Sequence, residues 1–211
     1  APPPRRVVEQ PRRPQKPTPL LREDFKSVTG IPDRWSVGVL ATPPETFDPN
    51  IAVESKGGVL TIAPLPHETG IRFSGYVSQA TFNLRTSIIT VELRHPAAGA
   101  TTIVAAAIDA ANWVGFRIEN GQLSMESHAA GRIALRKAAS ATRFLRLRMS
   151  NVAPVVVWET STDGTSWTPG YVETASINIT ALKIALSAGT TTSVRTAGAA
   201  TFARVSVERK P

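Results

Sequence analysis

The chain has 211 residues, of which 42% are hydrophobic, so it can bury one sizeable core. It contains no cysteine, which excludes disulfide bonds, thiolate metal sites and thiol catalysis. The net charge is +8, but residues 1–22 hold six basic residues against one acidic residue, so the body is nearly neutral. We therefore expect neither nucleic acid as a partner nor, without an apolar run of ~18 residues, a membrane span.

The first segment is rich in proline. Residues 1–20 contain seven prolines, which fix φ and remove backbone donors, so an extended, largely polyproline II arm reaching up to ~60 Å is expected. The alternative is that residues 1–20 form a disordered linker. A sandwich domain is predicted to follow over residues 21–211.

Short strands are predicted from residue 21 onward. Breaks at Pro43-Pro44, Asp48-Pro49-Asn50 and Gly57-Gly58 separate the early ones. Alternation or β-branched content predicts strands at 21–25, 35–39, 51–55, 59–63, 71–79, 80–84, 88–94, 102–108 and 113–119.

Asn120-Gly121 is the strongest hairpin signal in the chain, because both residues tolerate positive φ. It leads to strands around Leu123, Met125 and residues 133–135. Farther on, strands are predicted at 182–188 and 202–208, and the stretches 97–102 and 187–201 are interpreted as edge strands and loops.

The segment from Arg143 to Trp167 predicts two antiparallel strands joined at 151–153 and then a tight turn at 162–165. Leu145, Leu147 and Met149 would face one way, and Phe144 with two arginines the other. Roughly twelve to fourteen short strands at sandwich-like spacing predict an all-β, two-sheet antiparallel jelly-roll sandwich.

Several motifs together resemble the concanavalin A-like lectin/glucanase jelly-roll superfamily, and most of all the non-catalytic C-terminal sandwich modules of bacterial β-xylosidases. They span about residues 21–208. The motifs are Gly58–Ile62, Asn112–Phe116 with Asn120–Leu123, Arg143–Leu147, Ser161–Trp167 and Ala200–Val207. Lectins, glycosidases and structural modules share this sandwich, so the resemblance implies the fold and leaves the activity open.

Catalysis is not expected from the carboxylates. Catalytic members of the superfamily commonly carry Glu-x-Asp-x-x-Glu along one strand, and this chain has no such run. We interpret the strand glutamates as solvated partners of nearby arginines: Glu92, Glu119, Glu126 and Glu159 with Arg94, Arg117, Arg146 and Arg148. The chain is therefore predicted not to be an enzyme.

Metal ligands and cofactor motifs give no positive signal. His67, His95 and His128 are widely spaced, and no phosphate loop, dinucleotide fingerprint or serine nucleophile motif occurs. No metal and no cofactor are expected. Structural calcium, which jelly rolls of this type often bind, would have only the acidic turn at Asp163.

Exposed aromatic residues could stack on sugars. Trp158 alternates with Val155 and Val157, so Trp158 and Tyr171 are the candidates for glycan stacking, whereas the other tryptophans are interpreted as packing residues. Asn178-Ile179-Thr180 is a glycosylation sequon, which makes Asn178 a candidate modification site.

Two functions follow from these observations. The first is a non-enzymatic extracellular or cell-surface subunit whose partners are copies of itself, assembled into fibres through its arm. The arm residues assigned to this role are Arg5, Arg6, Val7, Val8, Arg12 and Arg13. The alternative is a carbohydrate-binding accessory module of a secreted glycosidase, with a polysaccharide or an acidic glycan as partner.

Overall fold

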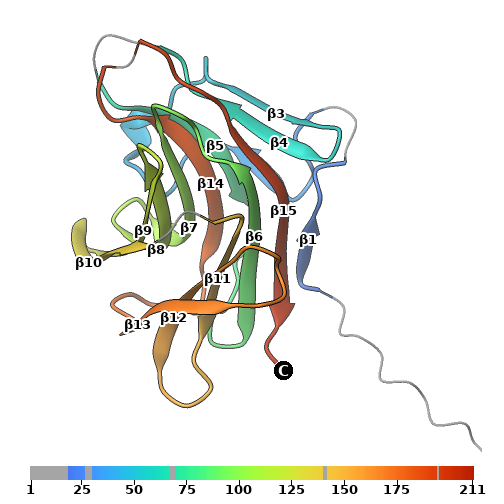
Figure 1. The fold of residues 1–211 in the computed structure, drawn as a ribbon, viewed down its shortest axis with the longest axis vertical. Helices are drawn as coiled ribbons and strands as arrows, with labels where there is room; N and C mark the ends of the chain where they lie inside the picture. Colours follow the sequence, from blue (N-terminus) through green and yellow to red (C-terminus); the bar gives the residue numbers. More distant parts are fainter. Residues whose placement is uncertain (1–18, 27–29, 67–69, 140–141, 194) are drawn as a thin grey trace, which may run out of the picture.

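Two antiparallel sheets packed face to face make up the fold (Figure 1). The structure is a computed structural model that describes residues 19–26, 30–66, 70–139, 142–193 and 195–211. The predicted all-β jelly-roll sandwich is confirmed. Residues 1–18, which include every residue of the assembly arm named above, lie outside the described part, as does His67. None of the helices in the described ranges has the length and apolar character that crossing a bilayer requires.

One sheet has eight strands in the order β13-β12-β11-β6-β15-β4-β3, with β1 paired beside β15. Its strands are β1 (Leu21–Glu23), β3 (Ala52–Lys56), β4 (Val59–Ala63), β6 (Ser87–His95), β11 (Phe144–Met149), β12 (Val155–Ser161), β13 (Thr168–Thr174) and β15 (Ala200–Arg209).

The other sheet has seven strands in the order β10-β9-β8-β7-β14-β5-β2. They are β2 (Trp35–Val37), β5 (Arg72–Ser78), β7 (Thr101–Asp109), β8 (Asn112–Glu119), β9 (Gln122–Ala129), β10 (Arg132–Ala139) and β14 (Lys183–Thr190). A short 3-10 helix, η1 (Pro44–Thr46), lies between β2 and β3.

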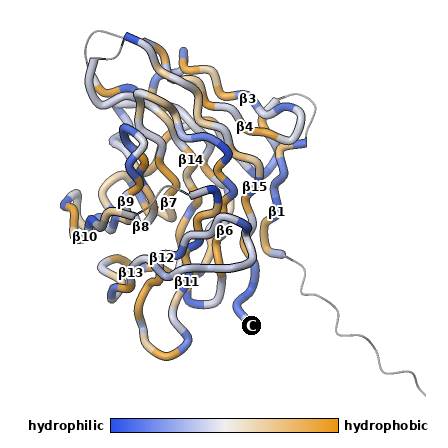
Figure 2. Tube along the Cα trace, viewed as in Figure 1, coloured by the Kyte–Doolittle hydropathy of each residue, from blue (hydrophilic) through white to orange (hydrophobic). Residues whose placement is uncertain are grey.

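The main core lies between the two sheets and follows the period-two pattern of the strands. Leu145, Leu147 and Met149 are buried in it, as the alternation predicts. Figure 2 shows hydrophobic and hydrophilic residues alternating along the strands. The Nε1 of Trp158 on β12 donates a 2.8 Å hydrogen bond to the carbonyl of Gly115 on β8, which ties the two sheets together through the core.

A second, smaller cluster lies on the outer face of the seven-stranded sheet. Ile103, Ala105 and Ala107 point away from the main core, since Val104 and Ala106 belong to it. With Phe73, Trp113 and Ala185 they pack beneath the segment 39–41, which covers part of this sheet. Both faces of β7 are therefore apolar, one because it packs in the main core and the other because residues 39–41 cover it.

Two strand predictions need correction, and one strand was not predicted. Residues 80–84 make only an isolated bridge between Phe82 and Leu182. Residues 187–190 belong to the central strand β14 and are no edge, since small side chains suit positions between two neighbours. Strand β13 was not predicted, because Thr168-Pro169-Gly170 begins it with residues that disfavour strands.

Candidate functional site

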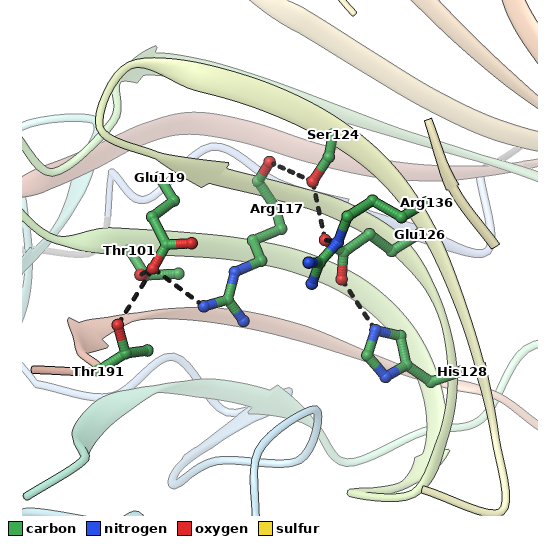
Figure 3. A network of polar contacts seen from close by, with 8 residues as sticks. All are labelled: Thr101, Arg117, Glu119, Ser124, Glu126, His128, Arg136 and Thr191. Carbon is green, nitrogen blue, oxygen red and sulfur yellow. Dashed lines mark hydrogen bonds and ion pairs between the residues drawn. The ribbon is translucent and has the colours of Figure 1, made fainter. Parts of the chain in front are cut away.

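The outer face of the seven-stranded sheet carries a polar network between β8, β9 and β10 (Figure 3). We call it the groove face, defined by Arg117 and Glu119 on β8, Glu126 and His128 on β9, and Arg136 on β10. The Asn120-Gly121 turn, with φ of 52° and 75°, sets the β8–β9 register. That register places Trp113 opposite His128 and Arg117 opposite Ser124, so side chains distant in sequence meet.

Glu126 is the centre of this network and is fully buried. Its Oε1 accepts hydrogen bonds from Arg136 Nε at 2.7 Å and from the Ser124 hydroxyl at 2.8 Å, and its Oε2 lies 2.8 Å from His128 Nε2. Burial alone would raise the pKa of Glu126, but the hydrogen bonds from His128, Ser124 and Arg136 outweigh it and lower the pKa to about 2. The carboxylate is therefore ionised and orients its three partners.

Glu119 sits at the end of β8 and is part-exposed. Its Oε1 accepts bonds from Arg117 Nη2, Thr101 Oγ1 and Thr191 Oγ1, each at 3.1 Å. Desolvation would raise the pKa of Glu119, but Arg117 and the two threonines lower it. Both groove carboxylates are thus held as anions at neutral pH.

Arg117 lies between the two carboxylates in Figure 3. Its Nε is buried and has no hydrogen-bond partner among the described residues. A buried donor without a partner costs about 1–3 kcal/mol, so this guanidinium retains bonding capacity.

Two adjoining cavities open on the groove face, and Arg117 lines both. The first has a volume of about 440 Å³, and polar residues make up most of its lining, among them Glu119, Asn120, Gln122, Ser124, Glu126 and Arg136. The second, about 320 Å³, is more apolar and lies against Ile71, Phe73, Pro43, Trp113 and His128. The rings of Trp113 and His128 stack with centroids 3.9 Å apart. A cavity lined mainly by polar residues beside a more apolar one suits a ligand that has both kinds of surface.

The sequence-based interpretation of the glutamates is right for two pairs and needs correction for two. Glu119 pairs with Arg117, and Glu159 pairs with Arg146 and Arg148. Glu92 pairs instead with Arg143, and Glu126 with Arg136. Moreover, Glu92, Glu126 and Glu159 are buried, not solvated.

The aromatic residues chosen for glycan stacking do not present open faces. Trp158 is 1% exposed, because it faces the main core and Val155 and Val157 face outward; no sugar can stack on it. Tyr171 is half-buried, packs against the same core and lies tilted to Trp158 at 6.4 Å. The prediction that Trp158 lies on the opposite face to Val155 and Val157 is confirmed. The prediction that the Trp158 face is the exposed one is wrong.

The remaining candidates lie away from the groove face. Asn178 is exposed, and its Oδ1 accepts hydrogen bonds from the Thr180 amide and hydroxyl, so its modification stays a prediction. The Asp163 Oδ1 accepts backbone amides at Thr165 and Ser166, which is the role of a turn residue.

Comparison of the sequence with protein-family models and with curated proteins finds no match. Solved structures do match. A prokaryotic β-1,3-1,4-glucanase (lichenase) derived from a mouse hindgut metagenome aligns with TM-score 0.66 and 11% identity, over 90% of this chain and 99% of that chain. The fold is a concanavalin A-like jelly roll.

Two further structures extend the comparison. A Mycobacterium tuberculosis protein described as an immunostimulatory antigen and pseudo β-1,3-glucanase aligns with TM-score 0.65 and 11% identity, over 92% of this chain and 99% of that chain. A xylan β-1,4-xylosidase from Bacillus halodurans C-125 aligns with TM-score 0.60 and 14% identity, over 95% of this chain but 41% of that chain.

These neighbours contradict two sequence-based predictions. The prediction of a self-assembling structural subunit is wrong, since the structures that share this fold over nine-tenths of the chain include a lichenase and a protein described as a pseudo β-1,3-glucanase. The prediction that the chain is not an enzyme is contradicted as well, because the match includes a glucanase.

Proposed function

We propose that the chain is a carbohydrate-active protein that binds a polysaccharide on the groove face. The observation that carries this proposal is the pair of adjoining cavities that share Arg117. A pyranose has an apolar C–H face and a rim of hydroxyl groups. The second cavity offers the exposed side chains of Ile71 and Pro43 as apolar walls, and the first offers side-chain donors and acceptors for hydroxyls.

The groove is prepared for a ligand before one arrives. Glu126 holds Arg136, Ser124 and His128 in place through hydrogen bonds of 2.7–2.8 Å, and Trp113 packs against His128. Fixing these side chains in advance lowers the entropy that binding must offset. The extracellular location predicted from the sequence stays part of the proposal, because polysaccharides of this kind are met outside cells.

A neutral polysaccharide fits the groove better than an acidic one. The arginines Arg117 and Arg136 are balanced by Glu119 and Glu126, so the lining carries little net charge. An acidic glycan would bring further negative charge toward two ionised carboxylates.

Hydrolysis of the bound glycan is a second candidate, favoured by the presence of two carboxylates on neighbouring strands of the same groove. Glu119 and Glu126 lie four register positions apart along the β8–β9 hairpin, about 13 Å along the strands. Carboxyl pairs in glycosidases are ~5–5.5 Å or ~6.5–9.5 Å apart, so the side chains would have to lean toward one another across Arg117. One of them would also need a proton, and a glycan that shields Glu119 from water would raise its pKa.

The test is affinity electrophoresis in gels containing β-1,3-1,4-glucan, β-1,3-glucan, β-1,4-xylan or polygalacturonate, with release of reducing ends measured on the same samples. We expect at least one neutral polysaccharide to retard the protein. Arg117→Gln should weaken this binding about tenfold, since bonds to charged groups contribute about 1.5–3 kcal/mol.

The matched control is Arg34→Gln, at an exposed arginine before β2, which should bind as the native protein does. Equal retardation of Arg117→Gln and Arg34→Gln would contradict binding on the groove face. Release of reducing ends that Glu119→Gln or Glu126→Gln abolishes would establish hydrolysis.

A further inference from the structure

One tryptophan differs from the other three in its exposure. Trp35, Trp113 and Trp158 are at most 2% exposed, whereas Trp167 is half-buried. Trp167 lies directly before β13 on the outer face of the eight-stranded sheet, on the side of the sandwich away from the groove face. Of the four, it is therefore the tryptophan with a ring edge and surface open to a ligand.

Trp167 forms a wall of a separate groove of about 350 Å³. The floor consists of Thr90 on β6 and Ser206 on β15, which are direct cross-strand partners. Arg204 and Glu208 line the other side, and both are exposed and without an ion pair in the described part of the chain. We call this surface the ladder face, defined by Thr90, Ser206, Arg146, Trp167, Arg204 and Glu208.

The Trp167 ring is held in place from beneath. The guanidinium carbon of Arg146 lies 4.0 Å from the ring centroid, a cation–π contact. Arg146 and Arg148 both pair with the carboxylate of Glu159, which is 2% exposed. Both arginines bind the carboxylate of Glu159, and Arg146 also stacks on the Trp167 ring, so neither is available to bind an anion.

The loop that carries Trp167 is also fixed. Asp163 Oδ1 accepts hydrogen bonds from the amides of Thr165 at 2.7 Å and Ser166 at 2.8 Å, and these amides lower the pKa of Asp163. The Ser161 hydroxyl accepts the Gly164 amide at 2.9 Å. Gly164 has φ of 76° and lies so close to the Phe144 ring that an added Cβ would be 3.1 Å from it. The wall of the groove is thus formed before any ligand binds.

We infer that the ladder face is a second glycan-binding site, in which a pyranose of a neutral polysaccharide lies against Trp167 and turns its hydroxyls toward Thr90, Ser206, Arg204 and Glu208. A flat aromatic wall, a floor of two hydroxyls and unpaired charged ends are the groups that recognise a sugar. The site goes beyond the proposed function, since it lies on the opposite sheet. Two sites on opposite faces allow one protein to engage two polysaccharide chains, or one chain with higher avidity.

The experiment uses the full chain and the same four polysaccharide gels, with Trp167→Ala, Trp167→Phe and Arg117→Gln. Trp167→Ala should weaken retardation by a neutral polysaccharide about threefold to tenfold, while Trp167→Phe should keep most of it because it retains a flat ring. In NMR spectra of the native protein, fragments of the same polysaccharide should shift the indole N–H signal of Trp167, which Trp167→Phe assigns.

The outcomes separate the two sites. If Trp167→Ala binds as the native protein and the Trp167 indole signal does not move, the ladder-face site is wrong, and a loss confined to Arg117→Gln leaves the groove-face proposal standing. If Trp167→Ala weakens binding and Arg117→Gln does not, the groove-face proposal is wrong and the ladder-face site stands. Should Trp167→Ala fail to fold, the indole shift in the native protein decides. No binding to any of the four polysaccharides overturns both.

Discussion

The two outer faces of the sandwich each carry a buried glutamate bridged to arginines across neighbouring strands, and they use it differently. On the ladder face, Glu159 pairs with Arg146 and Arg148, whose side chains are 20% and 24% exposed. On the groove face, Glu126 pairs with Arg136, which is 50% exposed, and neighbouring Arg117 keeps a buried Nε without a partner. The first arrangement engages both guanidinium groups with the carboxylate, whereas the second leaves a half-exposed guanidinium, that of Arg136, at the edge of a cavity.

The difference indicates which buried carboxylate mainly stabilises the fold and which mainly orients a binding surface. A buried carboxylate with two enclosed arginines mainly stabilises the sheet, because removing it would leave two charges unpaired. A buried carboxylate that fixes half-exposed partners mainly orients a binding surface. Each prediction below changes one face and compares the result with the other.

The largest effect is expected from Glu159→Ala. Two poorly exposed guanidinium groups would lose their common partner, so the free energy of unfolding should fall by about 3–5 kcal/mol in urea denaturation. Glu208→Ala, at an exposed glutamate on the same face, is the control and should change stability by no more than about 0.5 kcal/mol. If the two variants were equally stable, Glu159 would have no structural role.

The next effect depends on pH and concerns Glu126. Its pKa falls from the ordinary 4.5 to about 2 in the folded protein, which corresponds to about 3 kcal/mol of unfolding free energy. Because the folded-state pKa is the lower one, this stabilisation is complete above about pH 4.5 and is lost as the pH falls toward 2.

The measurement is a series of urea melts between neutral pH and acid on the native protein and Glu126→Gln. The variant should be less stable at neutral pH, and the two stabilities should converge as the pH falls. Parallel curves over the whole range would show that the carboxylate of Glu126 is not held ionised by its neighbours.

The smallest effect separates two glycines with the same backbone conformation. Gly164 on the ladder face and Gly121 in the β8–β9 turn have φ of 76° and 75°, but only Gly164 has atoms within contact distance of an added Cβ. Gly121→Ala should lose about 1 kcal/mol through conformation alone, and Gly164→Ala about 1 kcal/mol more through the Phe144 ring. Gly164→Ala should also weaken ladder-face binding, and equal losses of stability would contradict the close approach.

Much of the sandwich and part of the groove face follow from the sequence. The alternation in residues 143–149 and the Asn120-Gly121 turn predict the correct strands and faces. With a two-residue turn at Asn120-Gly121, the pairing of Arg117 with Ser124 and Trp113 with His128 could also have been derived by counting outward from the turn. That count was the missed signal for the groove face.

Other features depend on long-range packing that no local pattern contains. The partner of Glu126, Arg136, follows a register shift between Ile133 and Leu135 in β10, which moves every later residue by one position. The inward face of Trp158 depends on Gly115, 43 residues earlier, whose carbonyl accepts its indole proton. The packing of residues 39–41 over Ile103, Ala105 and Ala107 likewise depends on tertiary contacts.

The most direct test of glycan binding on the groove face is an NMR titration of the native protein with fragments of the polysaccharide that retards it most. Assigned backbone amides would be followed through β8, β9 and β10. We predict that the largest shifts occur from Arg117 to Glu126, together with the Arg136 amide and the Trp113 indole N–H. Saturable shifts that leave β8 and β9 unchanged, or no shifts at all, would contradict the groove face as the polysaccharide site.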